Sequence, residues 1–275
     1  MIIDTKTDAT AINYLTPIGL AWNQNSCAYD SILSIIYSLW LFNKPAWNGW
    51  LRQINNIHLR ELCVGFQNID NGIETLPSTR DKLRRRLQHV SNNKFPWGGF
   101  TSIEDILYYI LETNSTTFNY IVNCPHFTGY MDIHNTTCLL TAGITTKHSI
   151  DHWINNIELS HYRCDMCQDN IQTITKVCQN ISILAFHFAE HKPFINPVFN
   201  VNINEQNITY VLSGVIYFSN YHFISRIVNK SGLIWFHDGI TTGNDVIYEG
   251  TLLNDIDLSV CKGKHASAAI YTIKY

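Results

Sequence analysis

A cysteine near the N-terminus has the setting of a nucleophile. Cys27 follows a polar run rich in side-chain amides and opens an apolar segment that continues to Phe42. The segment predicts a helix, and a helix N-terminus carries unpaired N–H groups and about +0.5 of an elementary charge, which favours a thiolate. The amides of Asn23, Gln24 and Asn25 could stabilise a tetrahedral oxyanion. The same run also fits a small, buried hydrophobic cysteine at a helix start.

A histidine and an aspartate late in the chain could serve as base and orienting acid. Residues 221–228 and 233–239 have strand-like sequences and are separated by the turn-forming run 229–232. In an antiparallel hairpin closed there, His222 and Asp238 are about equally far from the turn and become near cross-strand neighbours. The carboxylate could then hold the imidazole through Nδ1, and the other ring nitrogen could take a thiol proton. The alternative is a surface histidine near a hairpin end.

The elements that must position these residues predict an α+β fold. Residues 31–42 are apolar nearly all round, as in a helix buried in the middle of a domain. Helices are also predicted over 79–90 and 100–112, the second with Thr101 or Ser102 as N-cap. Six β-rich runs then predict a meandering antiparallel sheet, over residues 181–188, 199–203, 209–217, 221–228, 233–237 and 268–274.

Composition and charge narrow the class of protein. The 275 residues are 45% apolar, which is enough for a large core, and only 15% are charged, with a net charge of −3. Nothing in this balance indicates a nucleic acid or an anionic membrane as partner, and Arg84, Arg85 and Arg86 are best explained as the solvated face of a helix. The N-terminus has no basic segment followed by an apolar stretch, and no window has the roughly 18 apolar residues of a membrane span. We therefore expect an intracellular protein, cytoplasmic or nuclear.

The cysteines are more consistent with reduced thiols than with disulfides. The eight cysteines are scattered through a chain large enough to fold without covalent staples. Five Asn-x-Ser/Thr sequons would favour secretion, but a chain rich in Asn and Thr produces them by chance. Cys164 and Cys167 have the one metal-type spacing, which could form half of a tetrahedral zinc site.

Several sequence boxes, in the same order, resemble those of the ubiquitin-specific proteases. Gly19-Leu20 with Asn25-Ser26-Cys27 resembles the family's Gly-Leu-x-Asn-x-Gly-Asn-Thr-Cys box. The predicted helix over 102–112 resembles the Gln-Asp-Ala-x-Glu-Phe helix of that family. Late runs resemble its palm strands, at 183–188, 209–216 and 267–275, together with a late His strand and a Trp-x-x-x-Asp strand. The resemblance extends from about residue 17 to the end, and the compact chain is similar to the SUMO-directed branch as well.

The resemblance implies one catalytic domain of papain-like architecture over residues 1–275. A helical thumb would cover about 17–115, reduced fingers about 116–180, and a palm sheet about 181–275. The substrate tail would pass through a cleft between thumb and palm.

The activity implied is that of a thiol isopeptidase acting on ubiquitin or a ubiquitin-like modifier such as SUMO. Cys27 would attack the carbonyl of the modifier's C-terminal glycine, His222 would shuttle the proton, and Asp238 would fix the imidazole tautomer. No cofactor is required for this chemistry.

Three positions depart from the family pattern, and one of them is Gly239, which follows Asp238 where the family commonly has a second acidic or polar residue. The family's oxyanion Asn lies five residues before its cysteine, where this chain has Trp22. A one-residue deletion would align Asn23 instead, and Gln24 or Asn25 could equally supply the donor. The glycine that precedes the family's histidine is replaced by Tyr221.

Zinc, in a structural site, is the one metal that the resemblance suggests. The family often carries two Cys-x-x-Cys pairs in its fingers, and here the earlier half must come from Cys124 and His126 or from His134 and Cys138. The set that we favour is Cys124, His126, Cys164 and Cys167. The alternative is a finger that has lost its zinc and keeps ordinary thiols.

Two other functions fit parts of the sequence. One is a catalytically inactive module that binds the modifier without cleaving it. The other is a different papain-like thiol enzyme, such as an amidase or an acyltransferase. The presence of Cys27, His222 and Asp238 together favours the isopeptidase, because a binding module has no need of all three.

Overall fold

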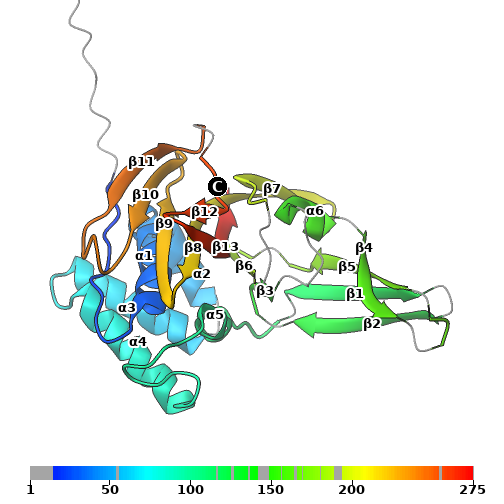
Figure 1. Cartoon of the computed structure of the whole chain (residues 1–275), viewed down its shortest axis with the longest axis horizontal. Coiled ribbons are helices and arrows are strands. Elements are labelled where there is room, and N and C mark those ends of the chain that lie inside the picture. The colour runs from blue at the N-terminus through cyan, green and yellow to red at the C-terminus, as the bar shows by residue number, and fades with distance from the viewer. Residues whose placement is uncertain are drawn as a thin grey trace, which may run out of the picture.

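Most of the helices come first in the chain, and most of the strands follow. A computed structural model describes residues 15–53, 56–115, 117–124, 127–135, 137–141, 149–155, 157–163, 166–168, 170–179, 181–188, 194–253 and 256–274. Within these residues the helices are α1 (Cys27–Phe42), α2 (Lys44–Gln53), α3 (Ile57–Asp70), α4 (Leu76–Val90), α5 (Ile103–Ile110) and α6 (Ile150–Asn155). Figure 1 shows α1 to α5 gathered at one end of the molecule.

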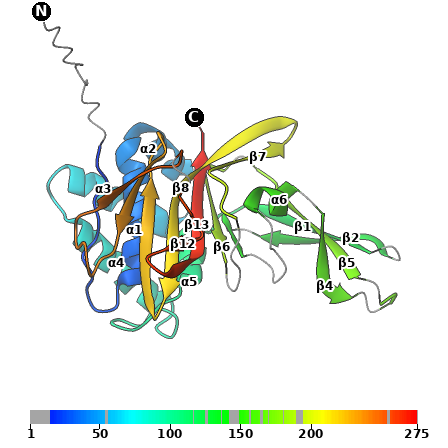
Figure 2. The same ribbon diagram turned by 45° about the horizontal axis from the view of Figure 1, so that its top comes forward.

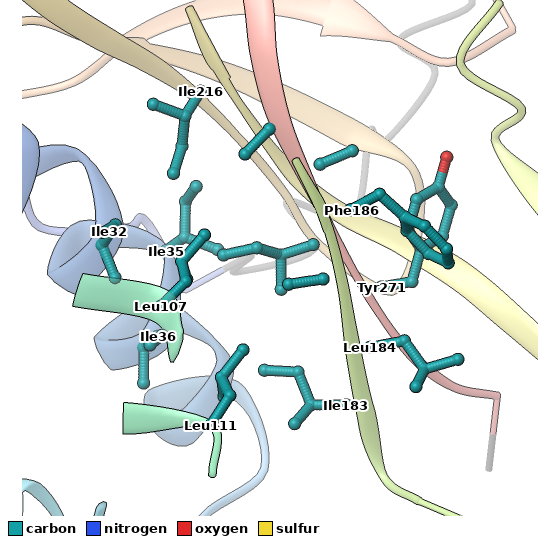
Figure 3. Close-up of a cluster of buried hydrophobic side chains, with 14 of the residues drawn as sticks. Ile32, Ile35, Ile36, Leu107, Leu111, Ile183, Leu184, Phe186, Ile216 and Tyr271 are labelled. Atoms are coloured by element: carbon teal, nitrogen blue, oxygen red, sulfur yellow. The ribbon is translucent and has the colours of Figure 1, made fainter. Parts of the chain in front are cut away.

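Helix α1 is the central element, as its apolar sequence predicts. It begins at Cys27, and every side chain from there to Trp40 is buried. It packs against two strands of the larger sheet, β9 (His222–Val228) and β8 (Gln206–Ser219), and against α2, α4 and α5. Figure 3 shows Ile35 and Ile36 of α1 in one cluster with Leu107 of α5 and Ile216 of the sheet. A thiol at the start of this helix is therefore held by the core of the protein.

The strands form two sheets. The larger has the order β11-β10-β9-β8-β13-β6-β3, with β7 paired to β8 and β12 paired to β13. Its strands are β3 (Leu139–Thr141), β6 (Ile183–His187), β7 (Val198–Ile203), β8 (Gln206–Ser219), β9 (His222–Val228), β10 (Leu233–His237), β11 (Ile247–Thr251), β12 (Val260–Cys261) and β13 (Lys264–Ile273). The smaller sheet has the order β2-β1-β5-β4. Its strands are β1 (Phe118–Cys124), β2 (Phe127–Asn135), β4 (Ile157–Arg163) and β5 (Asn170–Val177).

The two sheets lie at different ends of the molecule. In Figures 1 and 2 the larger sheet packs on the helices, and the four-stranded sheet extends to the side away from α1 to α4. The six predicted β-rich runs correspond to β6, β7, β8, β9, β10 and β13. Within the described residues, no helix is long and apolar enough to span a bilayer.

The prediction of a simple meander is wrong in two respects. The last strand, β13, enters the sheet between β8 and β6, so strands distant in sequence become neighbours. Strand β3 also pairs with β6 in the parallel direction. The expected start of α5 is confirmed, because Ser102 is its N-cap and its side chain accepts a hydrogen bond of 3.1 Å from the N–H of Glu104.

Candidate active site

Cys27 lies at the junction of helix α1 and strand β9. It is the first residue of α1, after the N-cap Ser26, and its side chain is 5% exposed. The thiol lies near the backbone of Phe223 in β9 and of Ala28 in α1, which act to lower its pKa. The residue before Phe223 is His222, so the fold brings the thiol beside the strand that carries the predicted base.

Burial dominates the protonation of this thiol. It raises the pKa of Cys27 above the ordinary value of 9.0, and the nearby carboxylate of Asp30 adds to the rise. The backbone hydrogen bonds from Phe223 and at the helix start lower the pKa, but by less. The expectation that the helix N-terminus makes the thiolate the favoured form is therefore wrong. The helix start does lower the pKa of Cys27, but burial raises it by more.

His222 and Asp238 meet, but not as directly opposed residues. In the β9–β10 ladder His237 pairs with Ser225, so Asp238 continues the strand opposite Ile224. His222 reaches it diagonally, with Nε2 2.8 Å from Oδ1 of Asp238. The predicted contact through Nδ1 is thus replaced by one through Nε2, the ring nitrogen farther from the backbone. Nδ1 is the nitrogen left for another partner.

Asp238 is held as a carboxylate by several donors. The backbone N–H of Ile240 donates to Oδ1 at 2.9 Å, and the hydroxyl of Thr241 donates to Oδ2 at 2.9 Å. Burial raises the pKa of Asp238, but the hydrogen bonds from His222, Ile240 and Thr241 together outweigh it and lower the pKa below its usual value. A charged Asp238 can orient the imidazole and stabilise its protonated form.

The loop before Cys27 is tied to the turn that carries Asp238. The N–H of Leu20 donates to Nε2 of His237 at 2.9 Å, and the N–H of Trp22 donates to the carbonyl of Gly239 at 2.8 Å. Gly19 packs so closely on the His237 ring that a Cβ at this position would overlap it. Gly19 and Leu20 therefore connect the loop before Cys27 to the end of β10, where Asp238 lies.

The three predicted oxyanion amides have different surroundings. Gln24 accepts a hydrogen bond from the indole N–H of Trp97 at 2.7 Å, and the amide of Asn25 donates to the carbonyl of Gly98 at 2.6 Å. The exposed side chain of Asn23 makes no hydrogen bond with the described residues. Of the three side chains, Asn23 alone is not engaged within the described part of the chain.

Two arginines of α4 lie behind this loop, which the sequence interpretation missed. Arg80 and Arg84 are buried, and Arg84 is only 3% exposed. The prediction that the Arg84 to Arg86 run is a solvated face is wrong for Arg84 and agrees with the exposure of Arg85. The signal was present in the spacing, because positions 80 and 84 fall on the same helix face as the buried Leu76 and Leu87.

Arg80 forms a buried ion pair beneath the start of α1. Its guanidinium lies 2.9 Å from Oδ1 of Asp30 and donates to the carbonyl of Ala21 at 2.8 Å. The hydroxyl of Ser26 donates to the other Asp30 oxygen at 2.6 Å. Burial raises the pKa of Asp30 to about 7, against the opposing effects of Arg80 and Ser26. The pair joins α4, α1 and the nucleophile loop.

A hollow borders the candidate site on the side of α5. It encloses about 380 Å³, and its lining residues are Phe100, Thr101, Ser102, Ile103, His187, Phe218, Tyr221, Phe223 and Ser267. The exposed rings of Phe100 and Tyr221 approach to 5.7 Å between centroids. Tyr221 lies in the β8–β9 turn with φ of 57°, a left-handed conformation that glycine adopts more easily.

The predicted zinc ligands fall largely outside the described residues. Cys164 and His126 are not described, and Cys124 is described only as part of strand β1. Cys167 is partly exposed. Within the described residues, no group of three or more His, Cys, Asp or Glu side chains could hold a metal ion.

Comparison with known proteins identifies the fold. No known family and no curated protein matches the sequence. A chain of the SAGA Ubp8/Sgf11/Sus1/Sgf73 DUB module bound to ubiquitin aldehyde superposes with a TM-score of 0.57 and 12% identity, covering 94% of this chain and 70% of the matched one. A second structure of that DUB module, bound to monoubiquitin, gives 0.53 and 14%, covering 98% and 73%. The chain therefore has a mixed helix and sheet fold similar to that of deubiquitinase structures.

Proposed function

We propose that this protein is a cysteine hydrolase that cleaves the bond after the C-terminal glycine of ubiquitin or of a ubiquitin-like modifier. One observation carries the proposal: Cys27 opens a buried helix that packs against β9, the strand that begins with His222, and the His222 ring is held at 2.8 Å by Asp238. Nucleophile, base and orienting acid are thus gathered from three distant parts of the sequence.

The protonation states favour general-base catalysis. Burial keeps the Cys27 thiol protonated, and Asp238 is charged, so the imidazole between them is the group that can take the proton. As the Cys27 sulfur bonds to the glycine carbonyl carbon, the thiol proton passes to the His222 nitrogen that Asp238 does not hold. His222 then returns this proton to the departing amine, and water, activated by the same imidazole, hydrolyses the thioester to free the thiol.

The choice of substrate rests on two independent likenesses. The sequence boxes around Cys27 and along the late strands resemble the ubiquitin-specific proteases, and the fold is similar to that of a DUB module determined with ubiquitin bound. In this proposal α1 to α5 form the thumb, the larger sheet the palm and the four-stranded sheet the fingers. The hollow beside Phe100 and Tyr221 would then receive the last residues of the modifier tail.

Activity-based probes test this proposal. The protein is incubated with ubiquitin and SUMO that carry a C-terminal electrophile, and adducts are mapped by mass spectrometry. We expect one modifier to label Cys27, and Cys27→Ala to abolish the adduct. Cys138, which is buried, provides a matched control: Cys138→Ala leaves labelling in place. Failure of every modifier probe to label a folded protein would overturn the proposal, as would labelling that persists in Cys27→Ala.

Binding measurements separate the hydrolase from a binding module. Cys27→Ala should retain affinity for the modifier but release no product from a modifier fused at its C-terminus to a reporter amine. Wild-type protein that binds the modifier tightly, yet gives neither adduct nor product, would favour the inactive binding module instead.

We further propose a structural zinc held by Cys124, His126, Cys164 and Cys167. No step of the reaction depends on it. Elemental analysis of the purified protein should find about one zinc per chain, and Cys167→Ser should lower that content. Cys178→Ser, at a cysteine outside the set and at the other end of the β1–β5 pair from Cys124, should leave it unchanged. A zinc content well below one per chain in the wild-type protein contradicts the proposal.

A further inference from the structure

Two consecutive carbonyl groups of the loop before Cys27, those of Asn23 and Gln24, are held by one buried guanidinium. Arg84 of α4 donates from one terminal nitrogen to the carbonyl of Asn23 at 3.1 Å and from the other to the carbonyl of Gln24 at 2.6 Å. Two consecutive carbonyls are therefore bound by the two ends of one planar fork. A lysine could not reproduce this geometry, because its ammonium is a point donor at the end of a flexible stem.

The hydrogen bonds from Arg84 to these two carbonyls fix the direction of the N–H groups that follow. In a planar trans peptide the carbonyl and the N–H point in opposite directions. The peptides after Asn23 and Gln24 turn their carbonyls toward α4, so the N–H groups of Gln24 and Asn25 point away from it. Neither N–H makes a hydrogen bond with the described residues.

The backbone conformation after these peptides makes adjacent N–H groups converge. Asn25 has a left-handed φ of 58°, whereas Ser26 is right-handed with φ of −81° and ψ of 0°. Such an alternation forms a concavity of successive N–H groups that suits an anionic oxygen. The run leads directly to Cys27, the proposed nucleophile.

The loop conformation needs an external hold. Gln24 and Asn25 both have positive φ, which is unfavourable for residues with a Cβ and is kept only when surrounding groups impose it. Arg84 supplies that restraint directly and also through Trp97. Its guanidinium lies 4.4 Å from the centroid of a Trp97 ring, and the Trp97 indole N–H donates to the side chain of Gln24.

From this geometry we infer that Arg84 is a positioning residue, which holds the loop before Cys27 so that its backbone N–H groups stabilise the oxyanion of the reaction. The inference rests on the proposed function and assigns the stabilising donors chiefly to the backbone. Of the candidate side-chain amides, the nitrogen of Asn25 already donates to the carbonyl of Gly98, whereas Gln24 is held through its oxygen, which accepts from the indole N–H of Trp97.

A transition-state analogue distinguishes this role from a structural one. The Cys27 thiol adds to a modifier with a C-terminal aldehyde: the sulfur bonds to the aldehyde carbon, and the thiol proton is transferred to the oxygen of the resulting hemithioacetal. That oxygen lies where the oxyanion forms. The unmodified modifier makes the same surface contacts without this adduct, so the ratio of the two affinities reports on oxyanion stabilisation.

The substitution Arg84→Met keeps the length and burial of the side chain and removes the fork. We expect kcat to fall about 10–100-fold, with KM changed by less than about threefold, because the reacting carbonyl loses aligned donors. The affinity for the aldehyde should fall by a similar factor and that for the free modifier should not. Arg84→Lys, which retains the buried charge, should recover only part of the loss.

The matched control is Arg86→Met, the same substitution on the same helix in a partly exposed ion pair with Glu61. It should leave kcat, KM and both affinities unchanged. If wild-type protein is active but Arg84→Met and Arg84→Lys keep the wild-type aldehyde affinity, or lose both affinities equally, the inference is wrong and the proposed function stands. If the wild-type protein reacts with no modifier probe, the proposed function fails and the inference fails with it.

Discussion

The imidazole of His222 reaches Asp238 diagonally across the β9–β10 pair, with Nε2 2.8 Å from Oδ1. The two strands pair as Val228 with Ile234 and as Ser225 with His237, so the register is two residues away from one that would place His222 and Asp238 opposite each other. Because side chains alternate faces with a period of two, this displacement keeps both groups on the same face. His222 and Asp238 can still form a hydrogen bond because the imidazole reaches its diagonal neighbour on that face.

The first prediction concerns the acid. Asp238→Asn should lower kcat by about 10²–10⁴-fold, because a neutral amide neither fixes the imidazole tautomer nor stabilises its protonated form. Steady-state cleavage of a modifier fused to a reporter amine measures the effect. Asp245→Asn, an exposed carboxylate in the same turn region, is the matched control and should retain wild-type kcat. A fall of less than about threefold in Asp238→Asn would remove Asp238 from the catalytic group.

The second prediction concerns the resting state of the thiol. Since burial raises the pKa of Cys27 above 9.0, the rate of alkylation by iodoacetamide should increase with pH up to and beyond that value. The measurement is the rate of Cys27 modification by mass spectrometry over a pH series, with Cys27→Ala as the blank. A midpoint below about pH 7 would instead indicate a preformed thiolate and imidazolium pair, and would contradict the general-base proposal.

Much of the candidate site could be predicted because its residues lie at the ends of a helix and of two strands that the sequence itself marks. Cys27 follows an amide-rich loop and precedes a long apolar helix, and both features are local in sequence. His222 and Asp238 flank a hairpin whose turn is marked by Asn229 and Gly232. The register of the two strands could not be predicted from the sequence. The N–H of Asn229 donates to the carbonyl of Leu233, and Gly232 adopts a φ of 75°, and together these lengthen the turn.

The elements that were missed depend on distant partners or on patterns that had been overlooked. Leu59, Leu62 and Phe66 recur at helical spacing after the N-cap Asn56, so the pattern that predicts α3 is local in the sequence. The position of β13 between β8 and β6 has no such local pattern, because the pairing of strands this far apart in sequence depends on the whole sheet. Arg84 is buried because its partners are carbonyls about sixty residues earlier, which no charge pattern reveals.

The third prediction tests the packing of the Gly-Leu box. Gly19→Ala places a methyl group against the His237 ring and 2.7 Å from the carbonyl of Asp245, so the loop must shift. We expect a loss of about 1–3 kcal/mol in the free energy of unfolding, measured by urea denaturation, together with lower activity. Gly49→Ala in α2 is the control, since nothing lies within 4 Å of its added Cβ, and alanine should stabilise the helix by about 0.5–1 kcal/mol. Equal stability of the two variants would contradict the close contact.

The last prediction concerns the pH dependence of stability, and it follows from His237. Burial lowers the pKa of His237 below its ordinary value of 6.5, against the opposing effect of hydrogen bonds with Gly243 and Leu20. The unfolded chain therefore binds a proton near pH 6.5 that the folded chain does not, so the stability present above that pH is lost as the pH falls, by at most about 1.4 kcal/mol per pH unit for this group.

Replacing His237 with Gln should reduce this loss. Urea unfolding at about pH 7.5 and about pH 5.5 gives the change in free energy for the wild-type protein and for His237→Gln. The measurement near pH 7.5, where the folded and unfolded imidazoles are both largely neutral, gives the cost of the substitution itself and so serves as the internal control. The variant should lose less stability than the wild-type protein between the two conditions, although His58 and His187, whose pKa values are also lowered by burial, still contribute. An unchanged difference would mean that His237 binds its proton equally well in the folded and the unfolded chain, which its burial behind Gly19 and Leu20 argues against.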